Sequence, residues 1–521
     1  MNEMIVDGER KSPPIIADVE IPYSVISKDL PSYMKTDFYQ ELGEILGYYK
    51  VYQRGADFSI EGTNGDYIGS DLKYKKCKDL IDQEARFLFA HTPDVYINKN
   101  TAHTEQEKNE ASILNDYIMK VFDKSAFADK LIKAAKDCFI GKRVACMLNF
   151  HVEQGISITF LKSYEFIYEK DNTEKLNKIV AFYTVVDSST RKDKRIKRKL
   201  YEMENGVCYV EESLFDGLGV LVEEVTPRTD TLFTYIPAVV IINDGLSNDG
   251  KGMSEIDELD EMESFYSKLA NADIDSGRKN MNAVRYTIDA SEESTANLSN
   301  APGAFWDLKS NTLTPDPKVA QVGMIESSMN YSGPLKVTLD RINNQMHSQT
   351  GVPDINSEQL QGVITSGKTL KALYWGLTVR CDEKMLVWEP AIRYIVTSLI
   401  DGGILYPESV ANYTDTPLPQ VDLDILVENN YALLEDDDEE KTMDLAEVSA
   451  SLMSRKAYMK KWRGLTDEEI DEELKQILLE KQMFEDSMIP MEREESEENE
   501  ELEPEKTENQ QDLEEDQTAI M

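Results

Sequence analysis

The hydrophobic period changes partway through the first half of the chain. Apolar residues recur at spacings of three and four in 36–54, 71–91 and 104–140, which predicts helices there. Beyond Val144 the period becomes two. Alternating runs then predict strands at 144–150, 156–160, 179–186, 199–203, 207–210, 220–225 and 238–242. Helices followed by a meander of strands indicate an α+β fold.

The second half shows an unusual order of parts. A helical segment, 253–281, is followed by a turn-rich insert with strand character, 283–326, and then by a second helical segment, 331–349. A polar loop, 351–365, leads into a very long helix from about Gly367. The apolar stripes of the two bracketing helices are narrow, which predicts that neighbouring copies of the chain cover them.

The long helix carries apolar residues at helical spacing as far as Leu399. Pro390 is expected to kink it, because proline lacks a backbone donor and clashes with the carbonyl four residues earlier. The pair Gly402 and Gly403 is expected to end it.

The C-terminal part is predicted to be a strand and then a helical region. The strand is expected at 422–427, and an acidic linker, 435–440, separates it from helices. Ser454 marks a helix start, and Thr466 with Glu469 matches a capping box, in which each side chain satisfies a free backbone donor of the other residue.

The charge balance narrows the possible partners. The 521 residues carry a formal net charge of −42, and residues 485–521 hold much of the acidic excess, which predicts a disordered tail. Tight DNA binding normally needs a basic surface. An acidic surface is instead compatible with DNA that passes along it without binding, because the negative charges repel the phosphates. One basic cluster, 191–199, is either a patch for nucleic acid or an acidic partner, or a solvated hairpin tip.

The cysteines and the terminus exclude several classes of protein. The N-terminus lacks a signal-peptide core, and no apolar run is long enough to span a bilayer, so no membrane partner is expected. Five cysteines occur without a C-x-x-C pair, which predicts buried, reduced thiols: Cys77, Cys138, Cys146, Cys208 and Cys381.

One segment matches the phosphate-binding loop of NTPases. Residues 362–369 read GVITSGKT, which fits G-x-x-x-x-G-K-[ST] in full. Such a loop needs a buried apolar strand before its first glycine, and 353–361 is polar and begins with proline. A P-loop NTPase therefore stays an alternative, and a helix capped by Thr365 or Ser366 is the other interpretation. The four histidines show no metal spacing, and no catalytic residue, metal site or cofactor site is predicted.

Five short motifs, in order, resemble one family. They are YYKVYQRG at 48–55, LIDQEARFLF at 80–89, GMSEI at 252–256, SGKTL at 366–370, and a final pattern from Leu452 through LTDEE at 465–469 to Glu480. Together they are similar to the portal proteins of long-tailed bacteriophages, the head-to-tail connectors through which DNA is packaged.

The resemblance implies a layout for the whole chain. It comprises an arm and α+β wing (1–252), a first stem helix (253–281), a clip (282–327), a second stem helix (328–349), a tunnel loop (350–366), a long kinked wing helix with a returning strand (367–434), a helical crown (435–484) and the acidic tail (485–521).

The resemblance also implies a function. A ring, usually of twelve subunits, would sit at one capsid vertex, and the terminase large subunit would dock on the clip and hydrolyse ATP, so the chain itself would be no enzyme. Further expected partners are a head-completion adaptor, scaffolding and major capsid proteins, and double-stranded DNA that passes non-specifically. The expected location is the virion, after assembly in the host cytoplasm. The alternatives are the NTPase and another structural capsid or scaffolding protein.

Two sets of residues are candidates for contact sites. Phe305 and Trp306 form an apolar cluster in the insert and are candidates for a clip interface. The candidates for the channel lining are Lys336, Arg341, Gly351, Val352, Pro353, Asp354, Ile355, Asn356, Ser357, Glu358 and Gln359.

Overall fold

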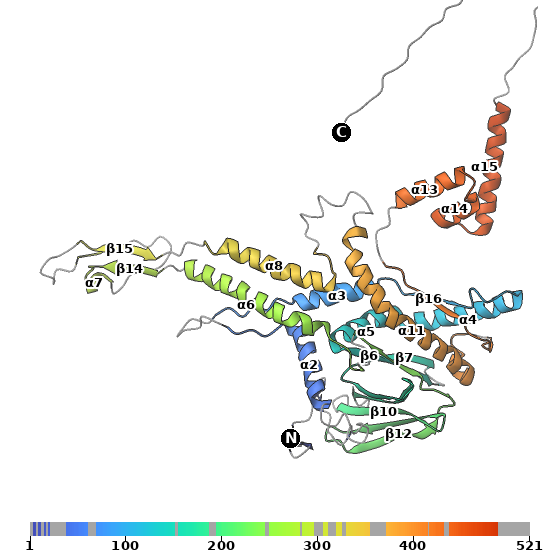
Figure 1. Ribbon diagram of the computed structural model, residues 1–521, viewed down its shortest axis with the longest axis horizontal. Coiled ribbons are helices and arrows are strands. Elements are labelled where there is room, and N and C mark those ends of the chain that lie inside the picture. The colour runs from blue at the N-terminus through green and yellow to red at the C-terminus, as the bar shows by residue number, and fades with distance from the viewer. Residues whose placement is uncertain are drawn as a thin grey trace, which may run out of the picture. The chain divides into compact units, whose positions relative to one another are not determined.

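The chain divides into two compact units, Met1–Glu435 and Asp436–Met521. The structure is a computed structural model, and helices and strands are both abundant in it (Figure 1). It describes residues 4–6, 9–11, 15–16, 19–20, 25, 38–60, 69–151, 155–186, 194–244, 250–281, 284–295, 306–310, 319–325, 330–354, 371–414, 416–431 and 437–487.

The first unit is built around α5 (Phe127–Gly141). This helix packs on a three-stranded antiparallel sheet of order β13-β6-β7. The strands are β6 (Arg143–His151), β7 (Gly155–Lys162) and β13 (Ala238–Ile242). Further helices of this body are α2 (Phe38–Arg54), α3 (Lys76–Leu88) and α4 (Glu105–Ser125). Ala126, in the left-handed conformation, separates α4 from α5, so the region 104–140 is two helices.

A second antiparallel sheet has the order β12-β11-β10-β9-β8. Its strands are β8 (Phe166–Lys170), β9 (Leu176–Val186), β10 (Lys194–Glu204), β11 (Val207–Phe215) and β12 (Leu221–Asp230). The sequence pattern missed β8, and it also missed β5 (Asp94–Ile97), which pairs with β16 (Ile425–Glu428). Both missed strands are too short to show a period.

The basic cluster is not a hairpin tip as far as the structure describes it. Lys194 already belongs to β10, and Arg198 and Lys199 are buried. On the neighbouring strand β11, Glu212 lies 2.6 Å from Lys199 and Glu211 lies 2.7 Å from Arg198. Ion pairs across the two strands therefore occupy Arg198 and Lys199, so these two residues do not belong to a solvated hairpin tip.

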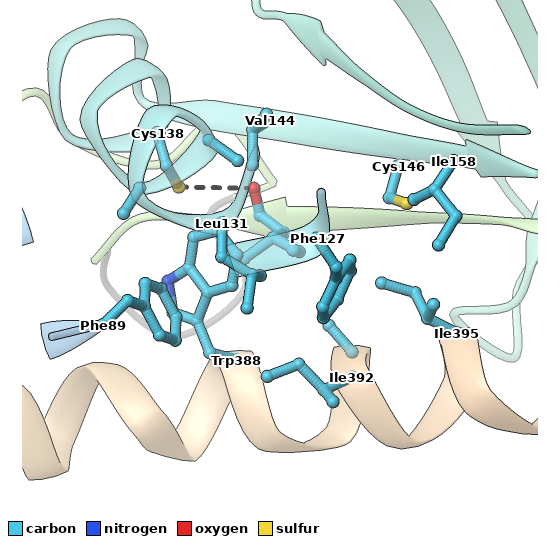
Figure 2. Packing of buried hydrophobic residues seen from close by; sticks show 14 of the residues in the cluster. Phe89, Phe127, Leu131, Cys138, Val144, Cys146, Ile158, Trp388, Ile392 and Ile395 are labelled. Atoms are coloured by element: carbon cyan, nitrogen blue, oxygen red, sulfur yellow. Dashed lines mark hydrogen bonds between the residues drawn. The ribbon is translucent and has the colours of Figure 1, made fainter. Parts of the chain in front are cut away.

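Helix α11 (Trp375–Leu405) spans the body, with Pro390 inside it. Trp388, Ile392 and Ile395 face Phe89, Leu131 and the other core residues (Figure 2). Gly402 and Gly403 do not end the helix, contrary to the sequence-based expectation. They are buried where Phe150, Leu418 and Tyr117 approach too closely for a side chain. The helix ends instead before Tyr406, because the residue before Pro407 disfavours the helical conformation.

Two long helices leave this body side by side (Figure 1). They are α6 (Glu255–Met281) and α8 (Ser332–Thr350). Between them in sequence lies a two-stranded antiparallel ribbon of β14 (Val284–Ile288) and β15 (Gln321–Ile325), with a single turn, α7 (Glu292–Thr295). Ile256 and Leu259 of α6 and Met346 of α8 are buried within the chain itself, so neighbouring copies are not needed at this end of the stripes.

Short elements complete the first unit. Helix α12 (Pro407–Val410) follows α11 directly. Near the N-terminus, β1 (Met4–Val6) pairs with β2 (Glu9–Lys11), and β3 (Ile15–Ile16) pairs with β4 (Val19–Glu20).

The second unit contains α13 (Asp437–Ser449), α14 (Arg455–Arg463) and α15 (Asp467–Ser487). Ser454 caps α14, and the backbone N–H of Thr466 donates to Glu469, as expected. The predicted acidic linker already becomes helix at Asp437, where acidic side chains favour a helix N-terminus. Helix α15 also runs three residues into the predicted tail, and 488–521 lie outside the described residues.

The buried glycine of α11 gives a direct test of this packing. A Cβ at Gly402 would lie 2.0 Å from a ring carbon of Phe150, so Gly402→Ala should lower the free energy of unfolding by about 1–3 kcal/mol. The matched control is Gly277→Ala in α6, where no atom lies within 4 Å. That variant should be neutral or more stable by up to ~1 kcal/mol, because alanine favours helix. Urea denaturation followed by circular dichroism measures both, and equal effects would contradict the packing.

Candidate functional site

The structure describes part of the predicted contact sets. Lys336 and Arg341 lie on α8 with exposed side chains, and neither forms an ion pair with a described residue. Trp306 is half-buried. Phe305 and residues 355–359 lie outside the described residues, as does the P-loop-like segment.

The residues that follow α8 are packed onto the body. Gly351 ends the helix in the left-handed conformation and touches Gly376 of α11, where an added Cβ would lie 3.0 Å from a backbone carbonyl. Val352 is buried, and a ring nitrogen of His347 lies 3.0 Å from its carbonyl oxygen. Asp354 accepts a hydrogen bond from Asn343. The side chain of Val352 therefore faces the core, which does not fit a channel-lining role within the subunit.

Helix α6 has a second, polar stripe that the apolar pattern did not reveal. Its members recur every four residues and are buried: Glu263, Ser267, Asn271 and Asp275. Spacing of four places them on one face of the helix. The first unit thus holds α6 along a line of polar side chains.

These side chains bind the backbone of the segment before α3. Glu263 accepts from the N–H groups of Ala56 and Cys77, at 2.8 and 2.7 Å. Asn271 both accepts from and donates to the backbone of Leu72, and Asp275 accepts from the N–H of Ser70. Residues 71–75, predicted as the start of α3, are not helical, and the backbone groups of Leu72 and Tyr74 bond to side chains of α6 instead.

Three buried charged side chains and the partly buried Arg380 meet at the base of α6. Lys384 of α11 lies 2.5 Å from Glu255 of α6 and 3.6 Å from Glu84 of α3. Arg380, one turn earlier on α11, lies 2.8 Å from Glu84 and 3.3 Å from Glu255. Asn243, after β13, accepts from Lys384 at 2.9 Å. This charge cluster joins three helices that are far apart in the sequence.

The two carboxyl groups of the charge cluster titrate differently. Burial raises the pKa of Glu84 to about 8, and the charge of Glu255 adds to the shift. Burial also opposes ionisation of Glu255, but Lys384 and Arg380 outweigh it and hold its pKa at about 2. Because the two groups are coupled, the pair as a whole keeps one proton near neutral pH.

Arg380 extends the charge cluster to α8. Its guanidinium donates to the carbonyl of Gln349 at 3.1 Å, in the last turn of that helix. Both long helices are therefore fixed to α11 through one side chain. A cation at a helix C-terminus also interacts favourably with the helix dipole.

The outer faces of the helix pair carry charges and a few apolar groups. On α6 the exposed residues include Glu258, Glu261 and Phe265. The ribbon exposes apolar side chains from both strands: Tyr286, Ile288, Val322 and Met324. Two-stranded ribbons are marginally stable alone, and this one leaves four large apolar side chains exposed.

Neither a metal-binding cluster nor a reactive thiol is found among the described residues. Among them, no group of three or more His, Cys, Asp and Glu side chains could hold a metal ion. Burial raises the pKa of all five thiols, which disfavours reactive thiolates. No described helix is long and apolar enough to cross a membrane. A cavity of about 60 Å³ adjoins the charge cluster, and it is small for a metabolite.

Sequence comparison supplies the family. A sequence model of the family described as "Phage portal protein, SPP1 Gp6-like" matches residues 72–486. This chain belongs to that family. The match runs from just before α3 almost to the end of α15, so it includes the charge cluster and both long helices of this portal-family chain.

Similar solved structures come from phage-like particles. One is titled as the neck of an empty GTA particle computed with C6 symmetry; it is 11% identical and has a TM-score of 0.38, covering 76% of this chain and 91% of that chain. A chain from the virion of a native gene transfer agent is 11% identical, with a TM-score of 0.35 and coverages of 81% and 99%. At these scores the likeness adds no weight to the assignment. No curated protein sequence matched the portal-family chain significantly.

The shared proton of the charge cluster predicts a pH dependence. Between the ordinary glutamate pKa and about 8, the folded chain binds a proton at Glu84 that the unfolded chain has lost. Stability should therefore fall as pH rises from 5 to 8, by at most about 1.4 kcal/mol per pH unit. Glu84→Gln should remove this slope, whereas the exposed Glu105→Gln should keep it. Urea midpoints from the fluorescence of buried Trp388 measure it, and identical slopes in all three proteins would contradict the assignment.

Proposed function

We propose that this chain is the subunit of a portal ring at one vertex of a phage capsid, through which the genome enters during packaging and leaves at ejection. The observation that carries the proposal is the family match over 72–486. The family supports a role as a connector. The proposal goes further in making this connector a ring, usually of twelve copies.

The described elements suggest where the parts of such a subunit lie. The body with its two sheets would be the wing, α6 and α8 the stem, and the ribbon of β14 and β15 the clip. Residues 350–366 would form the tunnel loop, α11 the wing helix, and α13–α15 the crown. In this arrangement the exposed apolar groups of the ribbon are covered by neighbouring copies.

The partners follow from the same proposal. The terminase large subunit would dock at the clip and supply ATP hydrolysis, so the portal chain needs no catalytic residues. A head-completion adaptor would take the same face after packaging, and scaffolding and major capsid proteins would surround the wing. The finished ring would belong to the virion, after assembly in the host cytoplasm, with Phe305 and Trp306 as candidates for the clip interface.

A conduit for DNA needs weak interactions with phosphate along its whole length. Each phosphate that a basic side chain neutralises releases counterions and adds affinity, so a fully basic wall would hold DNA. Acidic residues such as Glu258 and Glu261 on α6, with Lys336 and Arg341 on α8, supply a mixed wall. We propose that these two cations form basic rings that centre the duplex without trapping it.

The shape of the assembly tests the proposal directly. Purified full-length protein should elute at the size of a large ring without nucleotide, and negative-stain images should show a central channel. It should not hydrolyse ATP, and Lys368→Ala should leave ring formation unchanged. A monomer at every concentration, or ATP turnover that Lys368→Ala abolishes, would overturn the portal assignment in favour of the NTPase.

Charge reversal tests the basic rings separately. Lys336→Glu with Arg341→Glu should leave ring assembly normal, because neither side chain is paired with a described residue, and should change DNA packaging or retention several-fold. Lys108→Glu with Lys120→Glu on α4 makes the same charge change on exposed residues of the body and should have no effect on DNA. In vitro packaging with wild-type terminase is the measurement. Loss of rings, or unaltered packaging, would exclude the two cations as channel residues.

A further inference from the structure

The outer edge of the five-stranded sheet is left uncovered. Strand β12 is the last strand in the order, and all of its ten residues except Thr226 are exposed. Large apolar side chains on β12 and its flanks are between 43% and 70% exposed: Leu218, Val220, Leu221, Val222, Val225 and Leu232. Exposed apolar edge strands are templates for pairing with another chain.

The geometry of β12 limits where such pairing can occur. Its register against β11 slips at three places, and Pro227 lies within the strand. Bulges and prolines are devices that protect sheet edges. The part of β12 before Pro227, residues 221–226, keeps its backbone N–H groups and carries Leu221, Val222 and Val225, whereas the N–H groups of Leu218 and Val220 already donate to Asp216. This stretch is therefore the accessible part of the edge.

The chain also contains strand-forming segments that its own sheets do not use. Within the described part of the chain, β1 pairs with β2 and β3 with β4, and none of the four joins a sheet of the body. In residues 15–21, Ile15, Ala17, Val19 and Ile21 alternate with other residues, the period of a strand with one apolar face. Pairs of two-residue strands such as β3 and β4 are too short to be stable alone.

The arm has an anchor and a long reach. Val25 is 2% exposed and belongs to the main core, so the 24 residues before it are tethered to the body at that point. A fully extended chain rises about 3.3 Å per residue, so this arm can span roughly 80 Å. Such a reach extends to an adjacent copy in any closed ring.

We propose that the N-terminal arm of one subunit adds as a strand to the edge of β12 in the neighbouring subunit, with residues 15–21 beside residues 221–226. Main-chain hydrogen bonds would occupy the open edge, and the apolar face of the arm would lie beside the exposed apolar side chains on one face of β12. A single chain leaves both partners unused, so the pairing joins copies. The proposal rests on the proposed ring only in requiring adjacent copies.

Cysteine cross-linking between two differently tagged full-length chains tests the pairing. One chain carries Val19→Cys and the other Val222→Cys; the five native cysteines are buried and react slowly. Mild oxidation of mixed rings should join the two tags. The control replaces Val222→Cys by Lys170→Cys on β8, the opposite edge of the same sheet, and should give no such product.

The outcomes separate the possible occupants of the edge. Rings without the mixed product overturn the proposal but leave the portal function intact, and another protein such as the coat would then be the covering partner. A bond within one chain, seen with both cysteines on one chain, would mean that the arm covers its own β12, and would also overturn it. Failure to form any ring overturns the portal function and this inference together.

Removal of the arm gives a second readout that does not depend on cysteine geometry. Rings of a chain lacking residues 1–24 should show amide hydrogen exchange in 221–226 that is at least tenfold faster than in full-length rings. The exchange of β9, in the middle of the sheet, should not change. Equal exchange of 221–226 in the two rings would overturn the proposal.

Discussion

The arrangement of the first unit depends on the four charged side chains, three of them buried, that meet between α3, α6 and α11. Removing a carboxylate or an ammonium group from water is costly, and only close opposite charges and hydrogen bonds compensate. Glu84, Glu255, Arg380 and Lys384 compensate one another only when the three helices lie in this position. A shift of one helix would leave an uncompensated charge inside the protein, so the cluster defines the junction more sharply than apolar packing alone.

The polar stripe of α6 also fixes the position of this helix, at residues farther along it from the charge cluster. Apolar contacts tolerate sliding, whereas side-chain bonds to particular backbone groups do not. Glu263 and Asp275 each bind a backbone N–H of the segment before α3. These bonds fix the rotation of α6 about its own axis and its position along that axis. Arg380 then ties the end of α8 to the same framework. Polar groups along one side of α6 thus position the helix pair, in addition to the apolar contacts of Ile256, Leu259 and Met346.

The sequence predicted the elements well where periodicity was long and poorly where it was short or polar. The helix pair, the ribbon and the capping box at Thr466 followed from local pattern. The charge cluster did not, because Glu84 and Lys384 are 300 residues apart and each looks like an ordinary surface residue. The only sequence signal was local: the polar stripe recurs every four residues from Glu263 to Asp275, and Arg380 lies four residues before Lys384.

The glycines at 402 and 403 show why a rule of local conformation can fail. Glycine commonly ends a helix because it adopts the left-handed conformation without strain. Inside α11, glycine has a different role. Gly402 and Gly403 allow Phe150 and Tyr117 to approach the helix closely, and tertiary packing maintains the helix through both residues. The choice between these roles depends on residues that are far away in the sequence.

The surfaces left open by one subunit lie on separate elements: the β12 edge, the ribbon, and the exposed Trp375 and Leu386 of α11. A two-fold dimer would bury one such patch against itself and leave the others in water. A head-to-tail contact joins two different patches, and when it closes into a ring every copy has both covered. Several unlike apolar patches on one acidic subunit therefore favour cyclic assembly over pairing, and the mutual repulsion of the acidic subunits limits association at the remaining surface.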